Sequence, residues 1–190
     1  RQIKWMADRV GFVLVDLEFN AVNGGSFSVT ASKSPRAKES PLVARVLADE
    51  ERLGLHTDSP YVAFGQRVKQ SREDLLGFLR QAKADGRRVS ALGASTKGNV
   101  LLQYCGIGPD DIDVVAEVNS EKFGKFTPGP NIPIRPQEAV LAGGPDYLLV
   151  LPWHFREFFL ADPRLRGHTL VFPLPRLEVV PPRAGAGQGA

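Results

Sequence analysis

The stretch that decides the fold runs from residue 88 to residue 105 and reads RVSALGASTKGNVLLQYC. Val89–Leu92 is a short apolar run that predicts a strand, and Asn99–Cys105 predicts a helix. Between them, residues 93–99 read GASTKGN, a turn rich in glycine and hydroxyl groups. A strand, such a turn and a helix in this order are typical of a parallel sheet covered by helices.

The same alternation continues toward the C-terminus. Further strands are predicted at 114–118, 147–151 and 169–172, and further helices at 136–142 and 155–160. The run YLLVL at 147–151 is apolar throughout, as expected of a strand buried on both faces. We therefore predict an α/β fold over residues 87–180, with a Rossmann-like parallel sheet and covering helices. The low-complexity residues 181–190 predict a flexible tail.

The N-terminal part of the chain predicts different elements. Residues 1–10 have helical spacing, and residues 11–19 and 25–31 flank Asn-Gly-Gly, which predicts an antiparallel hairpin. Residues 36–86 predict a linker and two helices that pack on the C-terminal domain, each opened by Ser-Pro. Because the helix at 1–10 has no start signal, we expect the chain to be part of a longer protein.

Composition excludes several classes of function. The 190 residues include 24 Lys and Arg against 21 Asp and Glu, a net charge of +3 that is too small to indicate a nucleic acid or an acidic membrane as partner. The single cysteine, Cys105, excludes an internal disulfide and a Cys-cluster zinc site, so no metal is expected. Neither a secretory signal nor an apolar run of ~20 residues is present, so we expect a cytoplasmic chain.

The turn at 93–99 is the first candidate site. A loop between a strand and a helix binds anions because unpaired N–H groups and the helix dipole face it. Gly93 and Gly98 match the first and third glycines of the dinucleotide-binding pattern, but Ser95 replaces the middle one. Further polar groups come from Thr96, Lys97 and Asn99. A diphosphate is the natural ligand of such a turn, and the alternative is a helix-entry turn that binds nothing.

Two more segments follow strands and belong to the same edge of the sheet, where open α/β sheets bind ligands. Residues 117–134 offer Glu117, Asn119 and Lys122 to a ribose, a base or sugar hydroxyls. Residues 152–156 (PWHFR) offer His154 to a phosphate or sugar oxygen and Arg156 to a phosphate. The structural alternatives are a surface loop ordered by proline and a histidine that serves in capping or packing.

Four blocks in a fixed order resemble one known family. They read NGGSF at 23–27, GASTKGN at 93–99, EVNSEKFGK at 117–125 and PDYLLVLPWHFR at 145–156. Together they resemble the C-terminal part of the S-adenosylmethionine-dependent C-methyltransferases that act on nucleotide-linked deoxysugars. The resemblance covers residues 1 to about 180, and four ordered blocks are far more specific than any one of them.

The resemblance implies an enzyme of three parts: a zinc-binding domain, a central methyltransferase domain and a Rossmann-like C-terminal domain. Residues 1–35 would be the last helix and hairpin of the methyltransferase domain, and the sugar nucleotide would lie between the last two domains. The implied reaction removes a proton next to a sugar ketone, and the enolate then takes a methyl group.

The resemblance also implies what this chain does not carry. The zinc cysteines, the S-adenosylmethionine loop and the residues assigned to proton abstraction have no counterpart in it. We therefore expect S-adenosylmethionine to bind outside this chain, and no catalytic residue or metal ligand within it. The implied role is to hold the nucleotide-diphosphate sugar for the zinc and S-adenosylmethionine domains, and the 190-residue chain alone is expected to be inactive.

Two other functions stay open on the sequence. The spacing of Gly93 and Gly98, with Glu117 near the place of a ribose-binding acid, favours a nicotinamide-binding domain of an oxidoreductase. A non-catalytic module that only holds a parent enzyme together is the third possibility.

Overall fold

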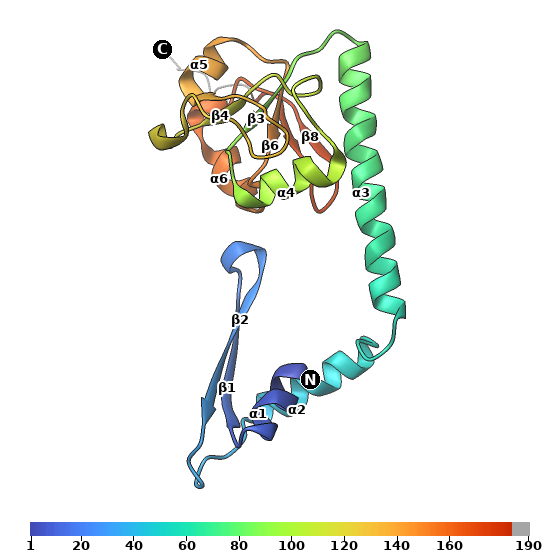
Figure 1. The fold of residues 1–190 in the computed structure, drawn as a ribbon, viewed down its shortest axis with the longest axis vertical. Coiled ribbons are helices and arrows are strands. Elements are labelled where there is room, and N and C mark those ends of the chain that lie inside the picture. The colour runs from blue at the N-terminus through green and yellow to red at the C-terminus, as the bar shows by residue number, and fades with distance from the viewer. Residues whose placement is uncertain (184–190) are drawn as a thin grey trace, which may run out of the picture. The chain divides into compact units, whose positions relative to one another are not determined.

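The computed structural model describes residues 1–183, and the chain divides into two compact units. The first unit runs from Arg1 to Arg67, and the second begins at Val68. Figure 1 shows the elements of both units along the chain. The predicted tail covers residues 181–190, of which residues 184–190 lie outside the described residues. In the described part of this segment, the Arg183 amide donates to the Arg166 carbonyl (2.8 Å).

The first unit is built around a β-hairpin. Its elements are α1 (Gln2–Arg9), β1 (Val13–Asn20), the short helix η1 (Val22–Gly24), β2 (Ser26–Ser32) and α2 (Pro41–Arg52). β1 and β2 pair antiparallel, and the turn uses positive φ at Gly24 (87°) and Gly25 (130°), which favours glycine. The predicted helix and hairpin at the N-terminus are therefore confirmed.

α2 packs on this hairpin. Ser40 caps the helix by accepting from the Leu42 amide (3.3 Å), and Pro41 occupies its first turn. Val43 of α2 clusters with Ala7 and Leu14 in the small core of the first unit. α2 thus belongs to the first unit, where its apolar face is buried against β1.

α3 (Ser59–Ala84) contains the boundary between the two units. Its C-terminal half lies beside the sheet of the second unit (Figure 1). Leu75, Leu79 and Ala82 recur at helical spacing and are buried in the main core. The helix ends before Gly86, whose φ of 67° suits a residue without a side chain.

The second unit contains a six-stranded sheet in the order β5-β4-β3-β6-β7-β8. Five strands are parallel, and β8 pairs antiparallel with β7 at the edge. The strands are β3 (Val89–Leu92), β4 (Val115–Glu117), β5 (Ile134–Pro136), β6 (Tyr147–Val150), β7 (Leu170–Phe172) and β8 (Glu178–Val180). This confirms the predicted α/β fold with a mostly parallel sheet.

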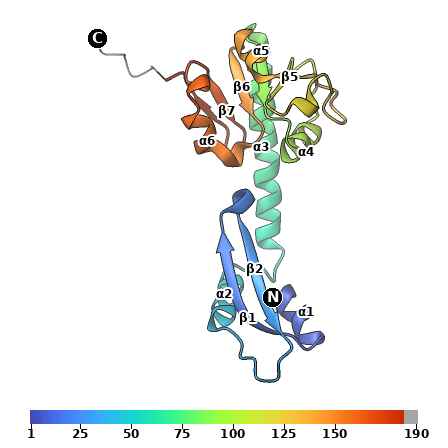
Figure 2. The same cartoon turned by 90° about the vertical axis from the view of Figure 1, so that its left-hand side faces the viewer.

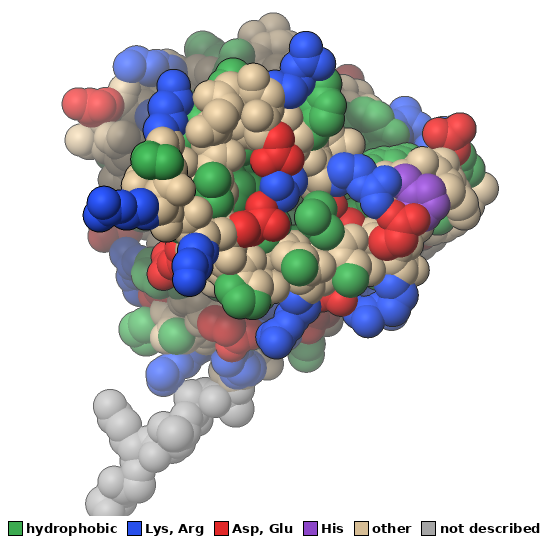
Figure 3. Space-filling model, turned by 90° about the horizontal axis from the view of Figure 1, so that it is seen from below, with side chains coloured by type: hydrophobic (Ala, Val, Ile, Leu, Met, Phe, Trp, Pro, Cys, Tyr) green, Lys and Arg blue, Asp and Glu red, His purple; other side chains and the backbone are tan. Residues whose placement is uncertain are grey.

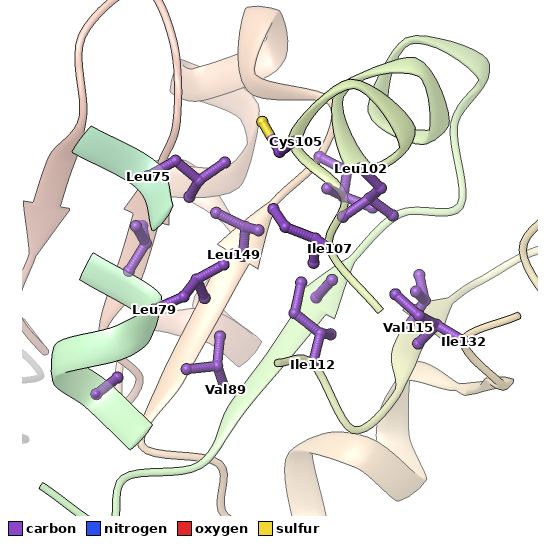
Figure 4. Packing of buried hydrophobic residues seen from close by; sticks show 14 of the residues in the cluster. Leu75, Leu79, Val89, Leu102, Cys105, Ile107, Ile112, Val115, Ile132 and Leu149 are labelled. Atoms are coloured by element: carbon purple, nitrogen blue, oxygen red, sulfur yellow. The ribbon is translucent and has the colours of Figure 1, made fainter. Parts of the chain in front are cut away.

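Helices cover both faces of the sheet. α3 and α4 (Thr96–Cys105) bury one face, where Leu75 and Leu79 meet Ile107, Leu149 and Cys105 (Figure 4). α5 (Gln137–Ala142) and α6 (Arg156–Ala161) cover the other face, over a core that includes Leu148, Val150 and Phe172. Figure 2 shows α4 and α6 on opposite sides of the strands.

The strand order creates a crevice between β3 and β6. From β3 the chain moves outward to β4 and β5, and it then returns to the other side of β3 as β6. Counted within this sheet, the order is 3-2-1-4-5-6, the doubly wound arrangement in which ligands bind outside the carboxyl ends of the strands at the point of reversal. The loops after β3, β4 and β6 meet at this edge.

The largest differences from the sequence predictions are two additional strands and an earlier start of α4. The sequence does not predict β5, because Arg135 and Pro136 are two of its three residues, or β8, a three-residue strand flanked by prolines. Strands this short give no periodic signal. α4 begins at Thr96 rather than Asn99, because the Ser95 side chain caps it. Residues 96–99 therefore form the first turn of the helix.

The surface has no continuous field of one charge on the face that Figure 3 draws, where Lys and Arg side chains are interspersed with Asp and Glu. This agrees with the near balance of charges in the sequence. Among the described residues, no helix combines the length and apolar character needed to cross a membrane.

Candidate functional site

Two glycines shape the loop after β3. Gly93 has a φ of 79°, and a Cβ there would lie 2.6 Å from Pro152 Cγ. A Cβ on Gly98 would lie 2.5 Å from Leu151 Cβ, so α4 packs against the end of β6 more closely than a side chain permits. These are the tight-turn and helix–strand packing roles of the first and third glycines in a dinucleotide-binding loop.

The polar side chains of this loop serve the start of α4. Ser95 Oγ accepts from the Gly98 amide (3.0 Å), so the hydroxyl oxygen is the helix cap. The Thr96 amide, one residue further, has no acceptor among the residues that the structure describes. Asn99 follows in the same turn, and its Oδ1 is buried without a donor from the described chain. Lys97 projects from the first turn and is exposed.

Glu117 at the end of β4 braces the loop after β3. The residue is 6% exposed; its Oε1 accepts from the Val118 (2.8 Å) and Asn119 (3.0 Å) amides, and its Oε2 accepts from the Ala94 amide (3.0 Å). Lys122 Nζ donates both to Glu117 Oε2 (3.1 Å) and to the Ala94 carbonyl (3.0 Å). We call this set the Glu117 brace.

The brace keeps Glu117 ionised. Burial is the largest single influence and would raise the pKa of the carboxyl. The amides of Asn119 and Val118 and the Lys122 ammonium outweigh burial together, so the pKa of Glu117 is lowered. A carboxylate held by four donors is a structural anchor with little basicity.

His154 lies after β6 in the short helix η3 (Trp153–Phe155). Its Nδ1 is buried and has no partner in the described residues, and its ring lies 4.3 Å from the Phe155 ring, measured between centroids. Burial, followed by the nearby charge of Lys97, lowers the pKa of His154, so the imidazole is neutral at pH 7.

Two cavities open at this edge of the sheet. The larger, of about 420 Å³, lies over the ends of β3 and β4 and is lined in part by Gly93, Glu117, Gln137, Phe158 and Arg164. The smaller, of about 280 Å³, is lined in part by Thr96, Asn99, Lys125 and Phe126. Ala94, Ser95 and Lys122 line both cavities and form the wall between them.

The structure therefore brings together most of the predicted site residues. Gly93, Ser95, Thr96, Asn99, Glu117 and Lys122 line one cavity or both. Lys97, Gly98, Asn119 and His154 are not among the lining residues. Gly98 sits beneath the loop, and Asn119 Oδ1 caps η2 (Ser120–Lys122) by accepting from the Glu121 amide (3.0 Å).

Arg156, suggested by the sequence as a phosphate ligand, is engaged elsewhere. Its Nε and Nη2 donate to Glu178 Oε2 (2.9 Å) and Oε1 (2.7 Å), and its Nη1 donates to Glu157 (2.6 Å). The guanidinium thus joins α6 to β8, and a phosphate would have to displace two carboxylates from it.

Among the residues of the larger cavity that sequence reasoning missed are Gln137, Phe158, Asp162 and Arg164. Gln137 directly follows β5, so recognising Ile134–Pro136 as a strand would have placed it at the ligand edge. Arg164 pairs with the buried carboxylate of Asp162 (Nη2–Oδ2 2.7 Å), a hydrogen bond that lowers the pKa of Asp162. No local sequence pattern predicts this ion pair.

The remaining reactive residues lie apart from the cavities. Cys105 is buried in the main core, and burial raises the pKa of its thiol, so the thiol is inert. Within residues 1–183, no group of three or more His, Cys, Asp or Glu side chains could hold a metal ion.

Comparison with known proteins identifies the family. The sequence profile described as the C-methyltransferase C-terminal domain matches residues 21–175. The chain belongs to this C-methyltransferase family.

A curated relative gives the same result. The chain is 32% identical over 174 residues to the C-methyltransferase NovU of Streptomyces niveus. The match covers 90% of this chain and 41% of NovU, so the chain spans about two fifths of the relative's length. Both the glycine-rich loop and the Glu117 brace fall inside the family match.

Proposed function

We propose that this chain is the substrate-holding part of an S-adenosylmethionine-dependent C-methyltransferase whose substrate is a nucleotide-diphosphate keto-deoxysugar. The observation that carries the proposal is the pair of cavities at the reversal point of the sheet, joined along Ala94, Ser95 and Lys122. A ligand of several parts suits two adjoining cavities better than a small metabolite does.

The diphosphate is assigned to the shared wall. The unpaired Thr96 amide and the positive end of the α4 dipole favour an anion there. The Ser95 hydroxyl keeps its proton for donation while its oxygen caps the helix. Lys122, 40% exposed in its side chain, adds a cation at the same place.

In the proposed reaction a base removes the proton beside the sugar ketone, and the electron pair passes into the enolate. The enolate carbon then bonds to the methyl carbon of the donor as the sulfur–methyl bond breaks. Neither Glu117 nor His154 is arranged as that base, because Glu117 is saturated with donors and His154 lines neither cavity. The chain's contribution is to bind and orient the sugar nucleotide.

The nicotinamide alternative is supported less well. A dinucleotide fold leaves its acidic residue open to the ribose hydroxyls, whereas both oxygens of Glu117 are occupied by donors from the chain. A non-catalytic module needs no cavity at the sheet edge, so the two cavities also favour a ligand-binding role.

A thermal-unfolding panel tests the proposal. The 190-residue chain is heated with dTDP, a dTDP-keto-sugar, NAD or NADP. A ligand at 100 times its Kd stabilises the chain by about 2.7 kcal/mol. We expect stabilisation by dTDP and the dTDP-keto-sugar and none by NAD or NADP. Stabilisation by the nicotinamide dinucleotides alone would replace this proposal with the oxidoreductase, and no stabilisation by any ligand would favour the non-catalytic module.

A further inference from the structure

Gln137, the first residue of α5, is one of the few buried polar residues that the structure describes in the second unit. It is 8% exposed and lines the larger cavity. Its side-chain amide makes no hydrogen bond with any residue that the structure describes, although an amide offers two donors and an acceptor. The atoms of the amide are not fully buried, so the amide is accessible from the cavity. The amide is left to water in the free chain, and a ligand edge with a donor and an acceptor can take the place of that water.

The charged groups around Gln137 are already engaged. The carboxylate of Glu117 accepts from three amides and Lys122, and that of Asp162 accepts from the Nε, Nη2 and backbone amide of Arg164. A sugar with several hydroxyls would find few open acceptors here. The side-chain amide of Gln137 instead matches a ligand edge on which a donor lies beside an acceptor.

Phe158 supplies a flat apolar surface to the same cavity. Phe158 lines the cavity and is 66% exposed, and it is held edge-to-face against Phe159 with ring centroids 5.5 Å apart. An exposed ring and a mostly buried amide that line one cavity can bind a planar heteroaromatic ring, the ring by its face and the amide by its edge.

We propose that the larger cavity binds the nucleobase of the sugar nucleotide, with Gln137 paired to its hydrogen-bonding edge and Phe158 packed on its face. This inference rests on the proposed function and adds a residue that determines nucleotide specificity. With the diphosphate on the shared wall, the sugar lies in the smaller cavity, beside Thr96 and Asn99.

Titration calorimetry of the chain with dTDP and with inorganic pyrophosphate separates the base from the diphosphate. Gln137→Leu removes both hydrogen bonds at nearly constant volume, so it should weaken dTDP binding about 10-fold and leave pyrophosphate binding unchanged. Gln70→Leu is the matched control, since exposed Gln70 of α3 donates to Asp74 (2.8 Å), outside both cavities, and its loss should change neither affinity. Phe158→Ala, at an exposed position, should also weaken dTDP alone, by about 5-fold or more.

Gln137→Glu gives a second, directional readout. A carboxylate offers two acceptors, which repel the oxygen of a thymine edge and suit the adjacent N–H groups of guanine. The affinity ratio of GDP to dTDP should therefore rise by about 10-fold or more. Circular dichroism of each variant checks the fold.

The outcomes distinguish the two proposals. If dTDP binds the parent chain and the folded Gln137 and Phe158 variants bind it equally well, the base lies elsewhere and this inference is overturned, while the proposed function stands. If neither dTDP nor pyrophosphate binds the parent chain, both fail.

Discussion

The absence of a side chain at Gly98 allows α4 to pack closely against the residue that follows β6. Its missing Cβ would lie 2.5 Å from Leu151 Cβ, a side-chain atom that cannot rotate away. Helix propensity alone would favour Gly98→Ala by ~1 kcal/mol, but overpacking typically costs ~1–3 kcal/mol, so the net expectation is loss of stability. The matched control is Gly77→Ala in α3, where a Cβ meets only Arg80 Nη2 at 3.9 Å and should stabilise by up to ~1 kcal/mol.

Urea unfolding of the two variants measures the change in unfolding free energy, which should fall for Gly98→Ala and rise for Gly77→Ala. A Gly98→Ala chain as stable as Gly77→Ala would show that α4 can move away from β6, and the close approach of loop and strand would lose its importance for the site.

Glu117 gives the fold a pH dependence. Its folded pKa is lowered, so its contribution to stability is complete above the unfolded pKa of ~4.3 and is lost as the pH falls through the folded pKa. Glu117→Gln places an NH₂ group among donors and should cost ~1–3 kcal/mol at pH 7. The cost should shrink as the pH falls below about 4, because the parent carboxyl then takes up a proton.

Unfolding free energies of the parent and Glu117→Gln between pH 7 and pH 3 provide the measurement. Glu121→Gln, in the same loop but exposed, is the control and should have little effect. A cost for Glu117→Gln that stays constant with pH would contradict the brace as a charged contact.

At the scale of elements, the two sheets differ in how many neighbours protect each strand. β1 and β2 have only each other, and two strands alone are marginal in water. β6 lies between β3 and β7 and has three fully buried residues. Amide hydrogen exchange should therefore be faster in Val13–Asn20 and Ser26–Ser32 than in Tyr147–Val150 by orders of magnitude.

Sedimentation is the control for that comparison, because pairing between copies of the hairpin would slow its exchange. Equal protection of the hairpin and β6 in a chain shown to be monomeric would refute the prediction.

The sequence predicted those elements whose apolar pattern is long or whose turn chemistry is explicit. The unbroken run at β6, the Asn-Gly-Gly of the hairpin and the glycine-rich turn after β3 were all recognised. β5 was missed because Ile134–Pro136 contains one buried residue, and a strand that short is defined by its partner β4. The site prediction missed Gln137 for the same reason, since its position depends on where β5 ends.

Hydrogen bonds between distant residues were also beyond the sequence. Glu117 was expected to meet a ligand, but in the structure its oxygens accept from the chain itself, including Ala94 23 positions away. Arg156 pairs with Glu178 across 22 positions. Such pairs form only once the sheet order is set, so residue type and spacing indicate a polar edge without saying which groups remain open to a ligand.

At the scale of the whole molecule, the chain combines a hairpin unit with a doubly wound sheet that presents two adjoining cavities. The family match begins at residue 21, inside the first unit, and ends at residue 175, after β7. We propose that this C-methyltransferase chain holds a nucleotide-linked sugar at the sheet edge after β3 and β4.

Nuclear magnetic resonance of the ¹⁵N-labelled chain titrated with dTDP tests this placement of the nucleotide. We expect amide shift changes concentrated at 93–99, at 117–122 and around Gln137 and Phe158, and unchanged shifts at the opposite end of the sheet near 109–113. Saturable changes confined to the hairpin unit or to residues 109–113, or no saturable change at millimolar dTDP, would contradict it.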